Sequence, residues 1–273
     1  MSGVSRRALP GFRVGLGYTV FYLSVLVLIP LAACVFKAAS LGPAEFVAAA
    51  WSPRARAAYA LTFGVAFAAA AVNVVLGLVV AWTLVRYDFP FKRFVDALVD
   101  VPLALPTAVA GLVYADLYSQ NGWLGHILVP LGFRAAYTPL GIVLVLVFTG
   151  FPFVVRTVQP VLADLDGEVE EAAAVLGATR WQTFRRVLFP TLFPPALTGF
   201  ALAFARGLGE YGSVIFISGG KVDNEIAAVL IVARLEEYAY AEAAAVAVVL
   251  LVISFVLLVL INLLERWSQR HAG

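Results

Sequence analysis

Long runs of apolar residues dominate this chain and limit what it can fold into. From residue 243 to residue 264 the sequence contains no Asp, Glu, Lys or Arg. A helix needs about 20 mostly apolar residues to cross a bilayer, and in lipid it satisfies its own backbone hydrogen bonds. Charged residues make up only 13% of the chain, against about 25% in soluble domains. The chain is therefore predicted to be an all-α, polytopic membrane protein.

At this length per span, the 273 residues have room for about six spans joined by short loops. The expected spans are residues 16–36, 60–85, 97–118, 139–158, 191–217 and 241–263. Residues 16–264 are expected to form a single membrane domain, with 1–15 and 265–273 as short terminal segments. No room remains in it for a soluble catalytic domain.

Basic residues are distributed unevenly between the loops on the two sides of the membrane. With the N-terminus in the cytoplasm, 12 Lys and Arg lie inside, six lie outside, and Arg206 lies within a span. An excess of Lys and Arg is typical of the cytoplasmic side. Both termini and the loop 164–190 are therefore predicted to be cytoplasmic, in a bacterial inner membrane.

Residues 164–190 form a polar, mixed-charge segment between two apolar runs. Acidic residues crowd its start, where the dipole of a helix favours them, and Gly177 is expected to end that helix at a sharp turn. Thr179 and Gln182 fit a capping box for a second helix, with Arg185 and Arg186 in its last turn, and Pro190 is expected to stop it. The segment is either an ordinary solvated connector or a docking site for another protein.

Arg206 and Glu210 are charged residues inside a predicted span, four positions apart and so on one helix face. Intramembrane charges usually face the protein interior or a water-filled path. One interpretation is a mutually compensating pair that fixes helix packing. The other is an anion path, with Ser213 as a further candidate, in which Glu210 prevents Arg206 from trapping the ion. In that case Arg206→Ala leaves assembly intact and lowers transport.

Other motifs predict no chemistry in this chain. The G-x-G-x-x-G at residues 207–212 lies in an apolar span, without the preceding strand that a dinucleotide site requires, and is interpreted as small residues that let helices pack or bend. The chain has no P-loop motif, one cysteine and two distant histidines. No metal site, cofactor, catalytic residue or nucleic-acid partner is predicted. Asn73, inside a span, is interpreted as an interhelical hydrogen-bond partner.

Four segments together resemble the permease subunits of the sulfate/molybdate branch of ABC importers, and most of all the T subunit of sulfate/thiosulfate permeases. They are residues 86–125, 151–162, 171–190 and 204–220. In the third, Glu171-Ala172-Ala173, Gly177 and Phe189-Pro190 are spaced as in the cytoplasmic EAA loop of such subunits. Val187 and Phe189 replace the more common Ile and Leu, and both keep an apolar side chain.

The resemblance implies a type I importer permease fold whose EAA loop docks on an ATPase. It implies three kinds of partner: a second permease subunit, either a paralogue or a copy of this chain; two ATPases that bind ATP and magnesium; and an extracytoplasmic sulfate-binding protein. The implied ATPase-coupling residues are Glu168, Glu171, Ala172, Ala173, Gly177 and Pro190. A bulky charged residue in the turn, as in Gly177→Asp, is expected to uncouple transport.

Three other functions are weighed against a sulfate importer. A molybdate or tungstate importer would share this architecture, since specificity in the family resides largely in the external binding protein. A secondary transporter would show two inverted halves and titratable groups at mid-membrane, and no second half matches the first. A membrane enzyme would need nucleophiles, metal ligands or paired carboxylates near one interface, and none converge.

Overall fold

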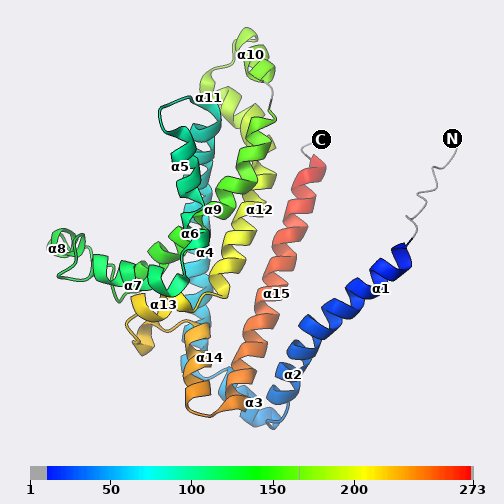
Figure 1. Cartoon of the computed structure of the whole chain (residues 1–273), viewed down its shortest axis with the longest axis vertical. Helices are drawn as coiled ribbons and strands as arrows, with labels where there is room; N and C mark the ends of the chain where they lie inside the picture. Colours follow the sequence, from blue (N-terminus) through cyan, green and yellow to red (C-terminus); the bar gives the residue numbers. More distant parts are fainter. Residues whose placement is uncertain (1–10, 166, 272–273) are drawn as a thin grey trace.

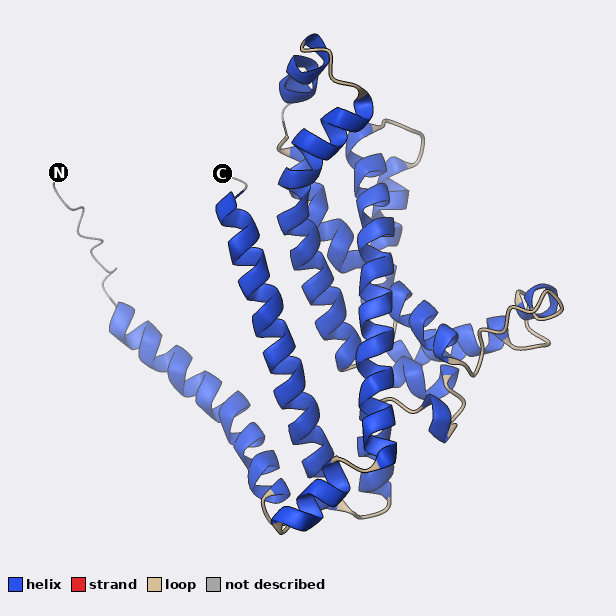
Figure 2. Ribbon diagram, turned by 180° about the vertical axis from the view of Figure 1, so that it is seen from behind, coloured by secondary structure: helices blue, strands red, loops and turns tan. Residues whose placement is uncertain are grey.

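The computed structural model describes residues 11–165 and 167–271, and all the regular structure in these ranges is helical (Figures 1 and 2). The first half comprises α1 (Phe12–Leu23), η1 (Ser24–Leu28), α2 (Ile29–Ala38), α3 (Pro43–Ala50), α4 (Pro53–Arg86), α5 (Lys92–Val99), α6 (Val101–Ala104), α7 (Thr107–Tyr118) and α8 (Gly125–Leu128). The second half comprises α9 (Pro139–Ala163), α10 (Gly167–Val175), α11 (Arg180–Thr183), η2 (Phe184–Leu188), α12 (Phe189–Leu208), α13 (Gly212–Ile217), η3 (Val222–Asn224), α14 (Ala227–Glu236) and α15 (Tyr240–His271).

Five helical stretches in the described residues are long and apolar enough to cross a membrane. They are Val14–Ala38, Pro53–Arg86, Pro139–Ala163, Arg180–Leu208 and Tyr240–Leu264. These stretches overlap five of the six expected spans, and the prediction of an all-α, polytopic membrane protein is confirmed. The expected terminal segment 1–15 lies mostly outside the described residues, while α15 continues through most of the expected tail to His271.

The remaining expected span, residues 97–118, is the third in chain order, and it is not one helix. It is divided among α5, α6 and α7, with breaks at Asp100 and at Leu105–Pro106. A residue before proline is pushed out of the helical region, and Leu105 has ψ 129°. Figure 1 shows α7 and α8 running out to one side, across the direction of α4. An apolar run of span length therefore does not form a straight crossing here.

Helices α4, α9 and α12 form the centre of the molecule and approach one another closely at glycines. A Cβ atom on Gly77 of α4 would lie 2.6 Å from Val154 Cγ1 of α9, and one on Gly199 of α12 would lie 2.7 Å from Val154 Cα. Small residues at such contacts let helix backbones pack tightly in membranes. Asn73 is buried between these helices, but its amide has no hydrogen-bond partner among the described residues, contrary to the role predicted for it.

Helix α1 extends away from the rest of the chain, as both ribbon views show (Figures 1 and 2). The apolar stretch from Val14 to Ala38 contains a wide π turn at Ser24–Leu28, and the side chains of its first half are exposed. The second half, α2, packs against α15 near the bend into α3. The bundle is therefore built from α4 onwards, and α2 is the part of the first span that joins it.

The contact between α7 and α13 leaves no space for a side chain at Gly111. A Cβ atom there would lie 2.6 Å from Ser213 Cα and closer still to the carbonyl oxygen of Ser213, and neither backbone atom can rotate away. We expect Gly111→Ala to destabilise the protein by about 1–3 kcal/mol, the usual cost of overpacking. Heating the detergent-solubilised protein and following the monodisperse peak by size exclusion measures the effect. Gly64→Ala, with nothing within 4 Å of the added Cβ, is the matched control, and equal midpoints for the two variants would contradict the prediction.

Candidate functional site

Helices α10 and α11 form the angled pair expected from the polar segment 164–190, at the tip of the molecule (Figure 1). Glu168 and Glu170 lie in the first turn of α10, where the positive end of the helix dipole stabilises carboxylates. Glu171 and Ala172 are exposed, and Ala173 is half-buried. The predicted surface is therefore accessible on this chain, as a docking surface must be.

The turn between α10 and α11 has the conformation that the sequence predicts. Gly177 has φ 81°, in the left-handed region that glycine adopts without strain. Its N–H donates to the Ala174 carbonyl at 2.9 Å, and the next N–H donates to the Ala173 carbonyl at 3.0 Å. In the capping box, Gln182 N donates to Thr179 Oγ1 at 3.3 Å and Thr179 N donates to Gln182 Oε1 at 2.8 Å. These bonds fix the angle between the two helices.

The prediction that Pro190 stops the second helix is wrong. Helical structure runs without interruption from Arg180 to Leu208, so Arg185 and Arg186 lie near its start rather than in its last turn. A proline ring normally clashes with the carbonyl group four residues before it. Here the preceding turn, Phe184–Leu188, is widened to a π turn in which Phe189 N donates to the carbonyl five residues back. The polar hairpin is therefore joined to the α12 span by continuous helix.

Apolar side chains that the sequence analysis did not single out are exposed on the same hairpin. Val175 and Leu176 at the end of α10 are both 87% exposed, and Trp181 of α11 is 67% exposed. The sequence could have indicated this exposure, because Val175 and Leu176 directly precede Gly177, at the turn of a polar hairpin. Exposed apolar side chains next to charged ones are compatible with a protein interaction site.

The three candidate residues of the translocation path are brought together at the end of α12. Arg206 forms an ion pair with Glu210, and Glu210 Oε1 accepts hydrogen bonds from Ser213 N and Ser213 Oγ, each at 3.0 Å. Glu210 is 1% exposed, whereas the Arg206 side chain is 35% exposed. The guanidinium is thus the accessible part of the cluster, and the carboxylate is its buried counter-ion.

The two charges do not share a helix face, contrary to the sequence analysis. Helix α12 ends at Leu208, and Glu210 lies in the short break before α13. Glycines permit close packing around the break: a Cβ on Gly207 would lie 3.2 Å from the Ala66 Cβ, and one on Gly212 would lie 2.5 Å from Thr107 Oγ1. The small residues of the G-x-G-x-x-G sequence therefore let the helices pack closely where the chain bends, in line with their structural interpretation.

Arg156 binds two carboxylates of the segment that precedes α7. Its Nε and Nη2 donate to the two carboxylate oxygens of Asp100 at 2.9 and 2.7 Å, and its Nη1 donates to Asp96 Oδ1 at 2.7 Å. The hydrogen bond from Arg156 lowers the pKa of the Asp96 carboxyl. Bidentate arginine–carboxylate pairs are among the stronger polar contacts. They hold α5 on α9, and no local sequence pattern predicts them.

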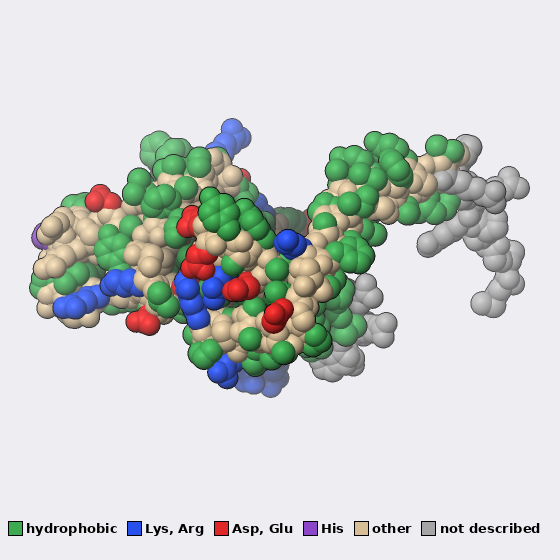
Figure 3. All heavy atoms as spheres, turned by 90° about the horizontal axis from the view of Figure 1, so that it is seen from below, with side chains coloured by type: hydrophobic (Ala, Val, Ile, Leu, Met, Phe, Trp, Pro, Cys, Tyr) green, Lys and Arg blue, Asp and Glu red, His purple; other side chains and the backbone are tan. Residues whose placement is uncertain are grey.

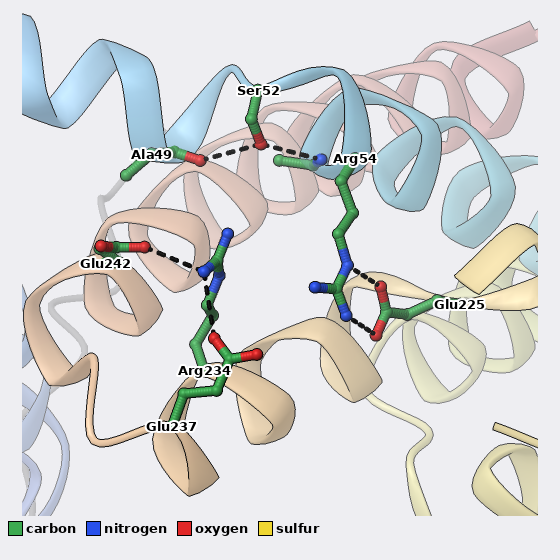
Figure 4. A network of polar contacts seen from close by, with 8 residues as sticks. Ala49, Ser52, Arg54, Glu225, Arg234, Glu237 and Glu242 are labelled. Carbon is green, nitrogen blue, oxygen red and sulfur yellow. Dashed lines mark hydrogen bonds and ion pairs between the residues drawn. The ribbon is translucent and has the colours of Figure 1, made fainter. Parts of the chain in front are cut away.

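A second group of charged residues lies at the opposite end of the molecule from α10, where oppositely charged side chains gather in the end-on view (Figure 3). Arg54 Nε and Nη2 donate to the carboxylate of Glu225 at 2.8 and 2.9 Å (Figure 4). Arg234 lies 3.1 Å from Glu237 and 3.2 Å from Glu242. These pairs join the start of α4, the loop after α13, and the ends of α14 and α15.

The described residues contain no group of three or more potential metal ligands from His, Cys, Asp and Glu. A cavity of about 790 Å³ lies between α4, α12 and α15 and is lined entirely by apolar and glycine residues.

A multi-pass helical bundle with an exposed polar hairpin between two spans is the architecture that the resemblance to importer permeases predicts. The chain matches the family described as "Binding-protein-dependent transport system inner membrane component" over residues 73–272. Because this match covers well over half of its length, the chain belongs to that family. It is accordingly a multi-pass inner-membrane permease subunit.

Two relatives match this chain over nearly its full length. It is 51% identical over 256 residues to the sulfate transport system permease protein CysT of Synechocystis sp., covering 93% of this chain and 90% of that protein. It is 46% identical over 271 residues to the protein of the same name in Escherichia coli K12, covering 98% of each chain. The resemblance to sulfate permeases of the T type is confirmed.

Two solved structures with the same fold come from a more distant transporter. The chain superposes with a TM-score of 0.74, at 16% identity and over 93% of both chains, on a chain of a bacterial alginate ABC transporter in complex with its alginate-bound periplasmic protein. A second structure of an alginate importer gives a TM-score of 0.71 at 18% identity. At such identities the likeness shows the fold alone, which is that of an ABC importer permease.

Proposed function

We propose that this chain is the membrane permease subunit of an ATP-driven sulfate/thiosulfate importer. The observation that carries the proposal is identity of 44–51% to proteins named as sulfate transport system permeases, over 83–98% of this chain. Molybdate or tungstate, the alternative left open by the sequence, is not favoured, since these relatives are all named for sulfate.

The coupling surface in this proposal is the α10–α11 hairpin, with Glu168, Glu171, Ala172, Ala173, Gly177 and Pro190 as the ATPase-coupling residues. Support comes from the exposure of Glu171 and Ala172 and from the exposed apolar side chains of Val175, Leu176 and Trp181 on the same hairpin. The hairpin end of the molecule then lies in the cytoplasm with both termini. ATP and magnesium are bound by the separate ATPase chains, and this chain needs no cofactor of its own.

The path in this proposal runs past the α12–α13 break, where Arg206, Glu210 and Ser213 meet. The exposed guanidinium attracts the oxyanion, and its buried counter-ion limits how tightly the oxyanion is held. A second permease subunit, paralogue or copy, supplies the other half of the path, and an extracytoplasmic sulfate-binding protein delivers the anion at the end that carries Arg54 and Glu225. When the two ATPases close on ATP, they move the α10–α11 hairpin of each permease subunit, and the path opens to the extracytoplasmic side.

Uptake of radiolabelled sulfate tests this proposal. Vesicles would contain this chain, its ATPase, the binding protein and a paralogous permease, with or without excess unlabelled molybdate. We expect ATP-dependent uptake that requires both permeases and resists molybdate. Uptake with this chain as the sole permease, abolished by molybdate, would instead identify a molybdate importer, and the same vesicles without ATP are the control for leakage.

A further inference from the structure

Helix α10 is held to the membrane-spanning bundle by very little. None of its residues is buried. Among the described residues its one ion pair to the rest of the chain joins Glu170 Oε1 to Arg86 Nη2, at 2.6 Å. That carboxylate oxygen is itself shielded from solvent, so the pair is less screened than one at an open surface. A displacement of α10 can reach the bundle through this pair, through the contacts of α10 with α11, or along the backbone.

Arg86 is placed to receive such a displacement. It occupies the last turn of α4, where the negative end of the helix dipole favours a cation. Its guanidinium lies 5.7 Å from the centre of the Trp82 ring, and its Nη2 donates to the Leu165 carbonyl at 3.5 Å. Trp82 in turn makes an edge contact with Phe184 of η2. The Arg86 side chain thus contacts Leu165 before α10, Glu170 within α10, and the Trp82 ring, which in turn contacts η2 after α10.

Helix α4 can carry this displacement across the molecule. It is unbroken over 34 residues, a length of about 50 Å, and it packs along α9 and α12. At its far end Arg54 holds Glu225 through two hydrogen bonds (Figure 4). Glu225 follows α13 and η3, the segment that begins at the break where Arg206, Glu210 and Ser213 meet. An arginine–glutamate pair therefore fastens each end of α4. Arg86 binds Glu170 of α10, which precedes α12 in the sequence, and Arg54 binds Glu225, which follows α12.

We propose that Arg86 and Glu170 are positioning residues that transmit the motion of α10 to α4. The inference rests on the proposed function, because it assigns to α10 the motion of a docked ATPase. Without the pair, α10 remains on the ATPase and moves with it, while α4 receives only what the contacts with α11 and the connecting backbone convey. ATP hydrolysis then continues, and its link to anion delivery is lost.

Glu170→Gln tests this by removing the charge while keeping the shape of the side chain. The complete complex is purified, reconstituted in lipid, and assayed for ATP hydrolysis with and without the loaded binding protein, and for sulfate uptake. We expect wild-type assembly and basal hydrolysis, with stimulated hydrolysis and uptake lowered about ten-fold, within the usual range of coupling between sites. Arg86→Gln is expected to have the same effect, and the reversed pair Arg86→Glu with Glu170→Arg is expected to recover much of the loss.

Lys92→Gln is the matched control, because it breaks the exposed Lys92–Asp88 pair (3.0 Å) a few residues further along the chain. This variant is expected to behave as wild type. A purely structural role for Arg86–Glu170 would lower the yield of complex without changing the ratio of stimulated to basal hydrolysis. An unchanged ratio in Glu170→Gln, or a reversed pair that assembles without recovering the ratio, overturns the inference. A wild-type chain that fails to co-purify with the ATPase overturns the proposed function itself, and the inference with it.

Discussion

Gly177→Val is expected to abolish sulfate uptake by the assembled importer. The backbone at position 177 has φ 81°, a conformation in which a β-branched residue is a marked outlier and a Cβ atom costs about 1–2 kcal/mol. No neighbouring atom lies within 4 Å of the added Cβ, so the effect arises from the backbone and not from a clash. The turn is expected to relax, so that α10 changes its angle to α11 and the proposed docking surface no longer matches the proposed ATPase partner.

Comparison with Gly177→Asn isolates this cause, because asparagine tolerates the left-handed region better than other side chains. ATP-dependent uptake and co-purification of the ATPase are measured for both variants, together with membrane insertion as a check on folding. Gly177→Asn is expected to retain most of the uptake. Gly177→Asp, which adds a charge at the proposed docking surface, is expected to uncouple transport although aspartate side chains tolerate this backbone conformation. Normal transport by the valine variant would show that the turn does not fix the coupling geometry.

Arg206→Ala is expected to lower sulfate uptake by at least about ten-fold, in the range for removing one partner of a buried charge pair. The change removes the accessible positive charge at the α12–α13 break. It also leaves the carboxylate of Glu210, 1% exposed, with only the two hydrogen bonds from Ser213. A loss of uptake would therefore have two physical causes to separate. One is the missing positive charge in the anion path, and the other is the unpaired buried carboxylate of Glu210.

The double variant Arg206→Gln with Glu210→Gln separates these causes. It removes both charges together, so no carboxylate is left buried without its partner. If the pair lines the path, the double variant assembles with the stability of wild type and still transports poorly. If the pair only fixes packing, the double variant recovers wild-type uptake, and the path assignment is wrong. Heating of the purified complex gives the stability, and vesicle uptake gives the transport.

Local signals were sufficient for the parts of the fold that depend on a few neighbouring residues. Apolar runs of span length have few stable alternatives to a helix in lipid, and five of the six expected stretches contain such a helix. The turn at Gly177 and the capping box of Thr179 and Gln182 were equally predictable, because each is satisfied within five residues of chain. The candidate path residues met in space as expected, although not along one helix.

Local sequence did not predict where helices end when the surrounding structure determines whether a helix breaks or continues. Two prolines gave opposite results: at Pro106 the chain breaks, whereas at Pro190 the helix continues because the turn before it widens. Apolar composition also does not distinguish a straight span from the divided segment 97–118. The ion pair between Arg86 and Glu170 joins residues 84 positions apart, and nothing in the local pattern of either residue selects the other.

The glycine contacts between α4, α9 and α12 determine where this molecule can change shape. Gly77 and Gly199 both receive Val154, and Gly150 receives Asn73, so sliding any of the three helices by one turn would press a side chain into a site sized for hydrogen. Packed cores of this kind switch between discrete arrangements rather than deform gradually. We therefore expect the three helices to move as one rigid body, with changes of shape at its edges, where helical structure is already interrupted at Pro106 and after Leu208.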